Sequence, residues 1–367
     1  MFTSAPQLKR DPLGSNEHVV QERSMKPIIS TVLLLLPPRL LAQATSSTDA
    51  PGLRDGPHQA VINDVRLWYR VAGRAAPGVP PVVFLHGGPG QGSYHFAALV
   101  GPYLERSLRM VYFDQRGSGK SERPWTGEYS MATLVEDIEG LRRELGVPQI
   151  ALVGHSFGGA LALEYAVAYP ARVARLVIVS GMWSMPVLAH YQCERIRAVY
   201  PALARAADSA ATGPDDRCQW FWNLPAPQRT PLYEALMFPD SGVRARLDST
   251  VAASHLPNTG ELSAALWRAG MSQYQFTSFA KVSMPTLLIA GRLDGAVVPK
   301  GLQELTQRLP NATFVEYDRS GHFVYLDEPD RFVRDVTSFI AARAAEGTMS
   351  PPSLLPNKRL KLTARVH

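Results

Sequence analysis

The 367-residue chain is long enough for one large catalytic domain with an insertion, and its 46% hydrophobic content is that of a globular protein. The formal net charge of +6 belongs to the two ends, because residues 45–347 hold 29 basic and 29 acidic residues. Residues 45–347 have no net charge and therefore no excess of basic side chains to bind a polyanion, so nucleic-acid binding is not expected.

Residues 1–44 are predicted to be a targeting extension. A short apolar run follows Met25 and Lys26, and Ala42-Gln43-Ala44 fits a small-x-small cleavage site, so we expect translation to start at Met25. The apolar run is too short to cross a bilayer, and stable membrane insertion is not expected. The segment predicts a periplasmic or secreted protein, with a cytoplasmic protein as the alternative.

Residues 45–347 alternate between short runs of buried-strand type and amphipathic helix patterns. An antiparallel strand pair is expected over 61–71, and the alternation predicts an α/β fold with a mostly parallel sheet of about eight strands flanked by helices. Later strands are expected at 81–85, 110–113, 150–153, 173–179, 285–289 and 313–317. Helices are expected at 131–145 (with Ser130 as N-cap), 158–169 and 302–309.

Residues 181–282 interrupt the alternation of strands and helices, since they show helical stretches and no strand pattern. We expect a helical cap inserted into a core of residues 45–180 and 283–347, and a solvated basic tail over 348–367. Cys193 and Cys218 are the only cysteines and both lie in the cap. Their even number allows a disulfide, and two buried free thiols remain the alternative.

Gly154-His155-Ser156-Phe157-Gly158 follows an expected strand and opens an expected helix. That position is typical of the G-x-S-x-G nucleophile elbow, in which a strained turn exposes the serine hydroxyl. The motif therefore predicts Ser156 as a nucleophile.

A nucleophilic serine needs a base and a group that orients the base, and in this architecture they follow in the order Ser, acid, His. His322 follows the 313–317 strand and is the one histidine of nine in the required place. Asp294 follows the 285–289 strand, with Asp318 as the nearest rival. We expect a triad of Ser156, Asp294 and His322.

Acyl transfer also needs donors for the oxyanion. The backbone N–H of Phe157 is one expected donor. Gly87 or Gly88 in the loop His86-Gly87-Gly88-Pro89-Gly90 is expected to supply the second, and the sequence does not choose between them.

Three motifs together carry a family resemblance: the H-G-G-P-G loop, the segment D-Q-R-G-S-G-K-S at 114–121 and the Ser156 elbow. With the stretch 321–332 they resemble the proline iminopeptidase branch of the α/β-hydrolases over roughly residues 60–180 and 283–345. The resemblance implies a serine aminopeptidase that acts through an acyl-enzyme. The elbow departs from that branch, which carries G-G-S-W-G-S where this chain has G-H-S-F-G-G.

The expected function is release of an N-terminal residue from a small-molecule or short-peptide substrate. The alternatives are an esterase or lactonase and, more remotely, a non-enzymatic ligand receptor on the same fold. An aminopeptidase must bind a free ammonium, for which carboxylates and aromatic walls in the cap are suited. The candidates are Glu194, Glu234, Asp240, Glu261, Trp220 and Trp222. No metal or nucleotide motif is found, so no cofactor is expected; the oligomeric state stays open.

Overall fold

The computed structural model describes residues 51–209, 217–256 and 260–342. The expectations for the targeting segment, the start at Met25, the cleavage site and the basic tail lie outside these residues.

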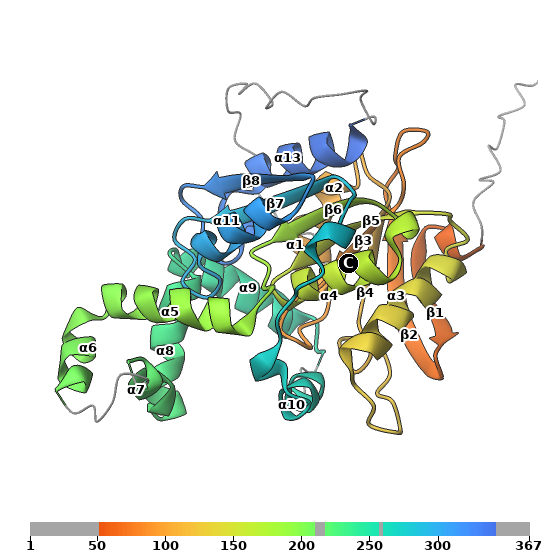
Figure 1. Cartoon of the computed structure of the whole chain (residues 1–367). Coiled ribbons are helices and arrows are strands. Elements are labelled where there is room, and N and C mark those ends of the chain that lie inside the picture. Colours follow the sequence, from red (N-terminus) through yellow and green to blue (C-terminus); the bar gives the residue numbers. More distant parts are fainter. Residues whose placement is uncertain (1–50, 210–216, 257–259, 343–367) are drawn as a thin grey trace, which may run out of the picture. The chain divides into compact units, whose positions relative to one another are not determined.

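One eight-stranded sheet in the order β1-β2-β4-β3-β5-β6-β7-β8 organises the chain (Figure 1). The first strand pair and the β2–β4 pair are antiparallel, and every other pair is parallel. The strands are β1 (Gly56–Ile62), β2 (Val65–Ala72), β3 (Val82–Leu85), β4 (Met110–Phe113), β5 (Ile150–His155), β6 (Val173–Val179), β7 (Thr286–Gly291) and β8 (Ala312–Tyr317). The predicted α/β sheet is confirmed. The first strand pair begins at Gly56, five residues before the expected start at 61, and the other strand ends shift by at most two residues.

Two apolar clusters cover the two faces of the sheet, because successive strand residues point to opposite sides. Val83 belongs to the cluster packed by α3 (Met131–Glu144), α4 (Phe157–Ala168) and α11 (Pro299–Arg308). Phe84 belongs to the other cluster. That second cluster is packed by α1 (Tyr94–Leu99), α2 (Gly101–Leu104), α12 (Val324–Asp327) and α13 (Pro329–Ala341). The parallel strands are thus buried on both faces, as their near-continuous apolar sequences require.

Local signals account for the helix boundaries. Ser130 is the N-cap of α3, since its hydroxyl accepts the backbone N–H of Thr133 at 3.0 Å, which confirms that predicted start. The short 3-10 turns are η1 (Pro51–Leu53), η2 (Pro170–Arg172), η4 (Met271–Gln273) and η5 (Phe279–Lys281).

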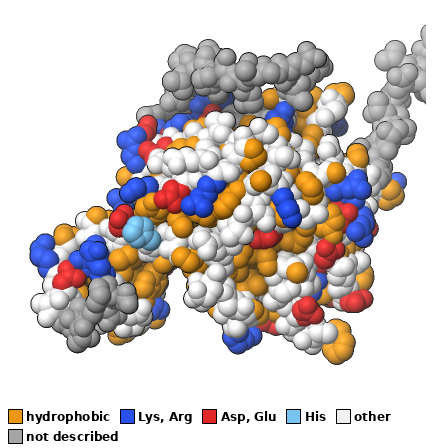
Figure 2. Space-filling view, in the orientation of Figure 1, with side chains coloured by type: hydrophobic (Ala, Val, Ile, Leu, Met, Phe, Trp, Pro, Cys, Tyr) orange, Lys and Arg blue, Asp and Glu red, His pale blue; other side chains and the backbone are white. Residues whose placement is uncertain are grey.

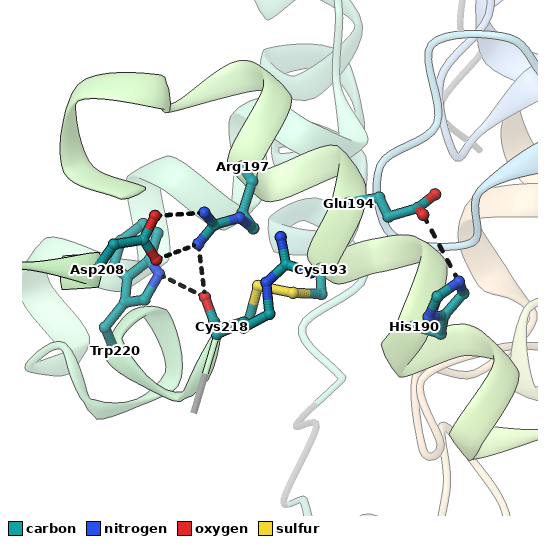
Figure 3. The surroundings of a disulfide bond; sticks show 8 residues. His190, Cys193, Glu194, Arg197, Asp208, Cys218 and Trp220 are labelled. Carbon is teal, nitrogen blue, oxygen red and sulfur yellow. Dashed lines mark hydrogen bonds and ion pairs between the residues drawn. A yellow bond between two sulfur atoms is a disulfide. The ribbon is translucent and has the colours of Figure 1, made fainter. Parts of the chain in front are cut away.

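The chain between β6 and β7 is helical where the structure describes it, apart from a single Ser184–Gln275 bridge. Its helices are α5 (Met185–Val199), α6 (Pro201–Asp208), α7 (Gln219–Asn223), α8 (Ala226–Met237), α9 (Ser241–Ala253) and α10 (Glu261–Arg268). A disulfide joins Cys193 of α5 to Cys218 before α7, with the two Cα atoms 5.6 Å apart (Figure 3). The structure therefore decides the cysteine question in favour of the bridge.

The face of the molecule in Figure 2 carries basic and acidic side chains interspersed with one another. In the described ranges, no helix combines the length and the apolar character that a membrane crossing needs.

Candidate active site

Ser156 lies in a sharp turn between the end of β5 and the start of α4, with a backbone φ of 54°. The turn depends on glycine on both sides. A Cβ on Gly154 would lie 2.3 Å from the carbonyl oxygen of Gly158, and a Cβ on Gly158 would lie 2.1 Å from that of Leu85. The strained conformation expected of a nucleophile elbow is therefore present at this serine.

His322 and Asp294 meet at the carboxyl end of the sheet. Nδ1 of His322 lies 2.9 Å from Oδ2 of Asp294, and both side chains are buried. Because a carboxylate accepts, Nδ1 of the imidazole carries a proton, and in the neutral ring Nε2 has the lone pair. The other Asp294 oxygen, Oδ1, accepts the backbone N–H groups of Ala296 (2.8 Å) and Val297 (2.9 Å).

The rival Asp318 is exposed and pairs with Arg292, so Asp294 is the acid that contacts the histidine. Among the described residues, no hydrogen bond joins the Ser156 hydroxyl to His322. Such bonds are often long in structures without substrate. The neighbouring His155 links the two positions instead: its Nε2 lies 3.0 Å from the carbonyl oxygen of His322.

The expected oxyanion donors lie on two sides of Ser156. Phe157 is the first residue of α4, where a backbone N–H has no partner within its own helix. Gly87 passes directly over the serine, because a Cβ built there would lie 2.9 Å from the Cβ of Ser156. A Cβ on Gly88 would instead meet the backbone nitrogens of Gly90 and Gln91 within the loop itself.

The segment 114–121 holds this glycine loop in place. Gln115 binds His86 twice: its backbone N–H donates to Nε2 of His86 at 3.1 Å, and its side-chain amide donates to the His86 carbonyl oxygen at 2.9 Å. The His86 proton therefore sits on Nδ1, which donates to the carbonyl oxygen of Gly87 at 3.0 Å. Burial lowers the pKa of His86 below its ordinary value, so the ring is neutral in this role.

The helices between β6 and β7 contact the acid and base loops through backbone atoms. Met237, the last residue of α8, accepts the N–H of His322 at 2.9 Å, and Leu236 accepts that of Gly295 at 2.8 Å. Burial, together with the nearby Asp294 carboxylate, raises the pKa of Tyr233 to about 12. Sequence reasoning missed these contacts, since a backbone carbonyl has no residue-type signature.

Each of the four acids proposed to bind substrate is engaged elsewhere. Glu194 lies 3.6 Å from His190 and 4.0 Å from Lys300, and it points along the exposed side of α5 (Figure 3). Glu234 pairs with Arg244 at 2.6 Å.

Asp240 caps α9 by accepting the N–H of Gly242 at 2.7 Å, and Glu261 pairs with Arg123 at 2.8 Å. Of the two tryptophans, Trp220 donates to the Arg217 carbonyl, and Trp222 packs on Tyr233 with ring centres 5.6 Å apart. Trp222 is thus one step removed from Asp294, through Tyr233.

A cavity of about 350 Å³ lies between the core and α9. Gln91 and Tyr94 line it from the core, and Leu247, Asp248 and Val251 line it from α9. Ser156 is not among its lining residues, but the backbone N–H of Gln91 donates to the carbonyl oxygen of Gly87 at 3.2 Å and so connects the cavity to the glycine loop. Within the described residues, no group of three or more metal-ligating side chains occurs.

Comparison with known proteins gives relatives over most of the chain. The proline iminopeptidase of Lactiplantibacillus plantarum is 27% identical over 77% of this chain and 99% of its own length. The crystal structure of a proline iminopeptidase-related protein from Thermus thermophilus is 25% identical, with a TM-score of 0.66, and covers 78% of this chain and 98% of that one. An esterase from Rhodococcus sp. ECU1013, 22% identical with a TM-score of 0.60 over 78% and 99% of the two chains, shares the fold.

The family model described as the alpha/beta hydrolase fold matches residues 80–329. The matched stretch spans β3 to the first residue of α13, and it holds the glycine loop, the elbow, Asp294 and His322. Because the match covers more than half of the chain and agrees with the sheet order and the relatives, this protein belongs to the α/β-hydrolase fold family.

Proposed function

We propose that the chain is a serine hydrolase that forms an acyl-enzyme on Ser156. The observation that carries the proposal is the buried 2.9 Å contact between Asp294 and Nδ1 of His322, beside an elbow serine with a positive φ. In this geometry Nε2 of the imidazole is left unprotonated and can accept a proton.

The proposed reaction has two halves. The Ser156 Oγ attacks the substrate carbonyl carbon as the hydroxyl proton passes to Nε2 of His322. The oxyanion that forms accepts hydrogen bonds from the backbone N–H of Phe157 and from that of Gly87 or Gly88. The imidazolium then gives its proton to the leaving amine or alcohol, which departs as the carbonyl reforms. Water attacks the ester in the second half by the same proton route, which releases the acid and restores the serine.

Ser156→Ala tests this mechanism. The variant is expected to lose fluorophosphonate labelling and to lower turnover by several orders of magnitude while its far-UV circular dichroism is unchanged. Full activity of a folded variant would rule the mechanism out. Labelling of the native protein without turnover of any substrate would instead favour the ligand-receptor alternative.

The first candidate reaction is release of an N-terminal residue. Its support is the resemblance of the glycine loop and the 114–121 segment to the proline iminopeptidase branch, together with relatives that bear that name. Under this interpretation the cap supplies carboxylates for the substrate ammonium. Glu234 is the best placed of the four, because α8 also carries the carbonyl groups that bind the His322 and Asp294 loops.

The second candidate is hydrolysis of a carboxylic ester or lactone, and two observations favour it. All four candidate acids have a cation or a backbone N–H as partner. The cavity beside the glycine loop has an apolar side formed by Leu247, Val251 and Ala252 of α9, and its one acid, Asp248, pairs with Arg244 at 2.6 Å. Such a cavity suits an apolar acyl chain better than an ammonium.

N-terminal acetylation of the substrate separates the two candidates. An aminopeptidase should lose cleavage of the acetylated aminoacyl anilide, because a neutral amide leaves the recognising carboxylates unpaired. An esterase should treat the free and the acetylated substrates alike and should prefer acyl esters or lactones in the same panel. Similar rates on both anilides would end the aminopeptidase hypothesis.

Export is the proposed location. Residues 25–44 carry the targeting pattern, and the Cys193–Cys218 bridge fits an oxidising compartment. N-terminal sequencing of the native protein is expected to begin at Thr45. A native protein that still begins at Met1 or Met25 would contradict export and favour the cytoplasm.

A further inference from the structure

His155, the variable residue of the elbow motif, has a buried imidazole that the proposed mechanism does not use. It is the last residue of β5 and is 1% exposed. Its ring lies among three others, with centroid distances of 4.8 Å to His322, 5.0 Å to Phe323 and 5.2 Å to Tyr325. The side chain therefore fills the space directly behind the candidate base.

The hydrogen bond of this ring fixes its tautomer. Nε2 of His155 lies 3.0 Å from the carbonyl oxygen of His322, and a carbonyl oxygen only accepts, so the proton is on Nε2. The opposite nitrogen, Nδ1, is buried and has no hydrogen-bond partner within the described residues. It faces Gly87, since a Cβ built on that glycine would lie 3.3 Å from it.

Charge considerations keep the ring neutral. Burial is the main cause that lowers the pKa of His155 well below its ordinary value, and the nearby His322, His95 and His86 act in the same direction. A second proton on Nδ1 would have no acceptor there and would lie beside the imidazolium that forms on His322 during the proposed reaction. The neutral, Nε2-protonated form is the one that this environment admits.

We infer that His155 is a positioning residue that sets the spacing between the base and the oxyanion loop: its Nε2–H holds the backbone of His322, and its unprotonated edge supports Gly87. One rigid ring thus connects the two parts of the site that must lie on opposite sides of the substrate carbonyl. A misplacement of about 1 Å between such groups costs roughly a hundredfold in rate.

Two matched variants separate the hydrogen bond from the ring. His155→Phe keeps an aromatic ring against His322, Phe323 and Tyr325 but removes the donor. His155→Gln removes the ring but keeps an N–H donor, because its amide nitrogen is three bonds from Cβ, as Nε2 is in histidine. We expect the phenylalanine variant to lose about 10- to 100-fold in kcat with KM changed less than about 2-fold. The glutamine variant should recover most of that loss.

The same ratios are expected in the rate of fluorophosphonate labelling, which needs no knowledge of the substrate. Two results would overturn the inference: wild-type kcat in His155→Phe, or a glutamine variant as impaired as the phenylalanine variant. A purely structural role would lower the melting temperature of both variants without the split between kcat and KM.

A measurement on the unmodified protein does not depend on variants that fold. In ¹⁵N-labelled protein, the imidazole shifts of His155, assigned by through-bond correlation to the backbone of the same residue, should show a protonated Nε2 and an unprotonated Nδ1 from pH 8 to pH 5. A proton on Nδ1, or titration near pH 6.5, would overturn the inference. The kinetic test rests on the proposed serine-hydrolase function, and the spectroscopic test does not. The labelling of Ser156→Ala therefore tests the proposed function, and the His155 tautomer tests this inference separately.

Discussion

The backbone N–H of His322 donates to the carbonyl oxygen of Met237 at 2.9 Å, so the candidate base is bonded to the last residue of α8. Leu236, one residue earlier, binds Gly295 next to Asp294. The helical segment between β6 and β7 is therefore part of the framework that places Asp294 and His322. A change that moves α8 is expected to move both of them.

Removing the disulfide tests how firmly this segment is held. The 25-residue separation between Cys193 and Cys218 gives an expected loss of about 3 kcal/mol in the free energy of unfolding for the double alanine variant, in the chain-entropy model. Chemical denaturation of the oxidised protein and of the variant measures it. Equal stabilities would show that the bridge constrains little, and adding reductant to the variant is the control that should change nothing.

Asp294→Asn is expected to fold and to lose about 10⁴-fold in turnover. The asparagine oxygen would accept the N–H groups of Ala296 and Val297 that Oδ1 now accepts, which turns the NH₂ group toward Nδ1 of His322. The imidazole would then carry its proton on Nε2 and be unable to accept one. Asp318→Asn, on an exposed acid, is the matched control and should retain wild-type turnover.

Gly87→Ala is expected to lower kcat at least about tenfold, because the new Cβ would lie 2.9 Å from the Cβ of Ser156 and displace the oxyanion loop. Gly301→Ala in α11 is the control, since its Cβ would meet only ordinary contacts at 3.7 Å. That change in the first turn of α11 should leave turnover unchanged. Steady-state kinetics and thermal melts of both variants decide the matter.

Asp137→Ala is expected to lower the free energy of unfolding by about 3–5 kcal/mol, because it leaves the buried guanidinium of Arg116 without its carboxylate partner. Both Asp137 oxygens accept from Arg116 at 2.6 Å, and Asn63 adds a third donor at 2.9 Å. Arg66→Ala, which breaks an exposed pair with Glu122 at 3.6 Å, should cost less than about 1 kcal/mol. Urea denaturation of the two variants compares them, and equal losses would contradict the buried-pair argument.

Acid should destabilise the protein through its buried histidines. Burial, with a smaller effect of His86, lowers the pKa of His95 to about 3, whereas an unfolded histidine titrates near 6.5. Between these values the unfolded chain binds a proton that the folded chain does not, so stability is lost as pH falls through this window. His95→Gln should reduce the slope of unfolding free energy against pH by up to about 1.4 kcal/mol per unit.

Much of the fold and of the candidate site could be predicted, because the sequence patterns that indicate them involve residues close together in the chain. Buried parallel strands are short apolar runs, and the strands at 110–113 and 173–179 have the bounds that the structure gives to β4 and β6. The glycines around Ser156 are required by backbone contacts within one turn, so the elbow is visible as a motif. Asp294 and His322 are found by their order, because each follows a strand that ends at the same edge of the sheet.

The segment 114–121 is a case in between. Its residue types resemble those of a known family, but what these residues do physically is known only from their contacts in the structure. Gln115 holds His86, and Asp114 accepts the N–H and the hydroxyl of Ser93, each at 2.7 Å. A Cβ on Gly119 would lie 2.2 Å from Oδ2 of Asp114, which explains the glycine. The motif therefore supports the glycine loop.

By itself the sequence determined the α/β sheet, the elbow and the order of serine, acid and histidine, since each depends on residues near one another in the chain or on strand topology. Only the tertiary structure decided the Cys193–Cys218 pairing, the ion partner of Glu234, the bond from His322 to Met237 and the tautomer of His155. These depend on distances between segments far apart in the chain, and two of them end on backbone carbonyl oxygens, which every residue carries alike.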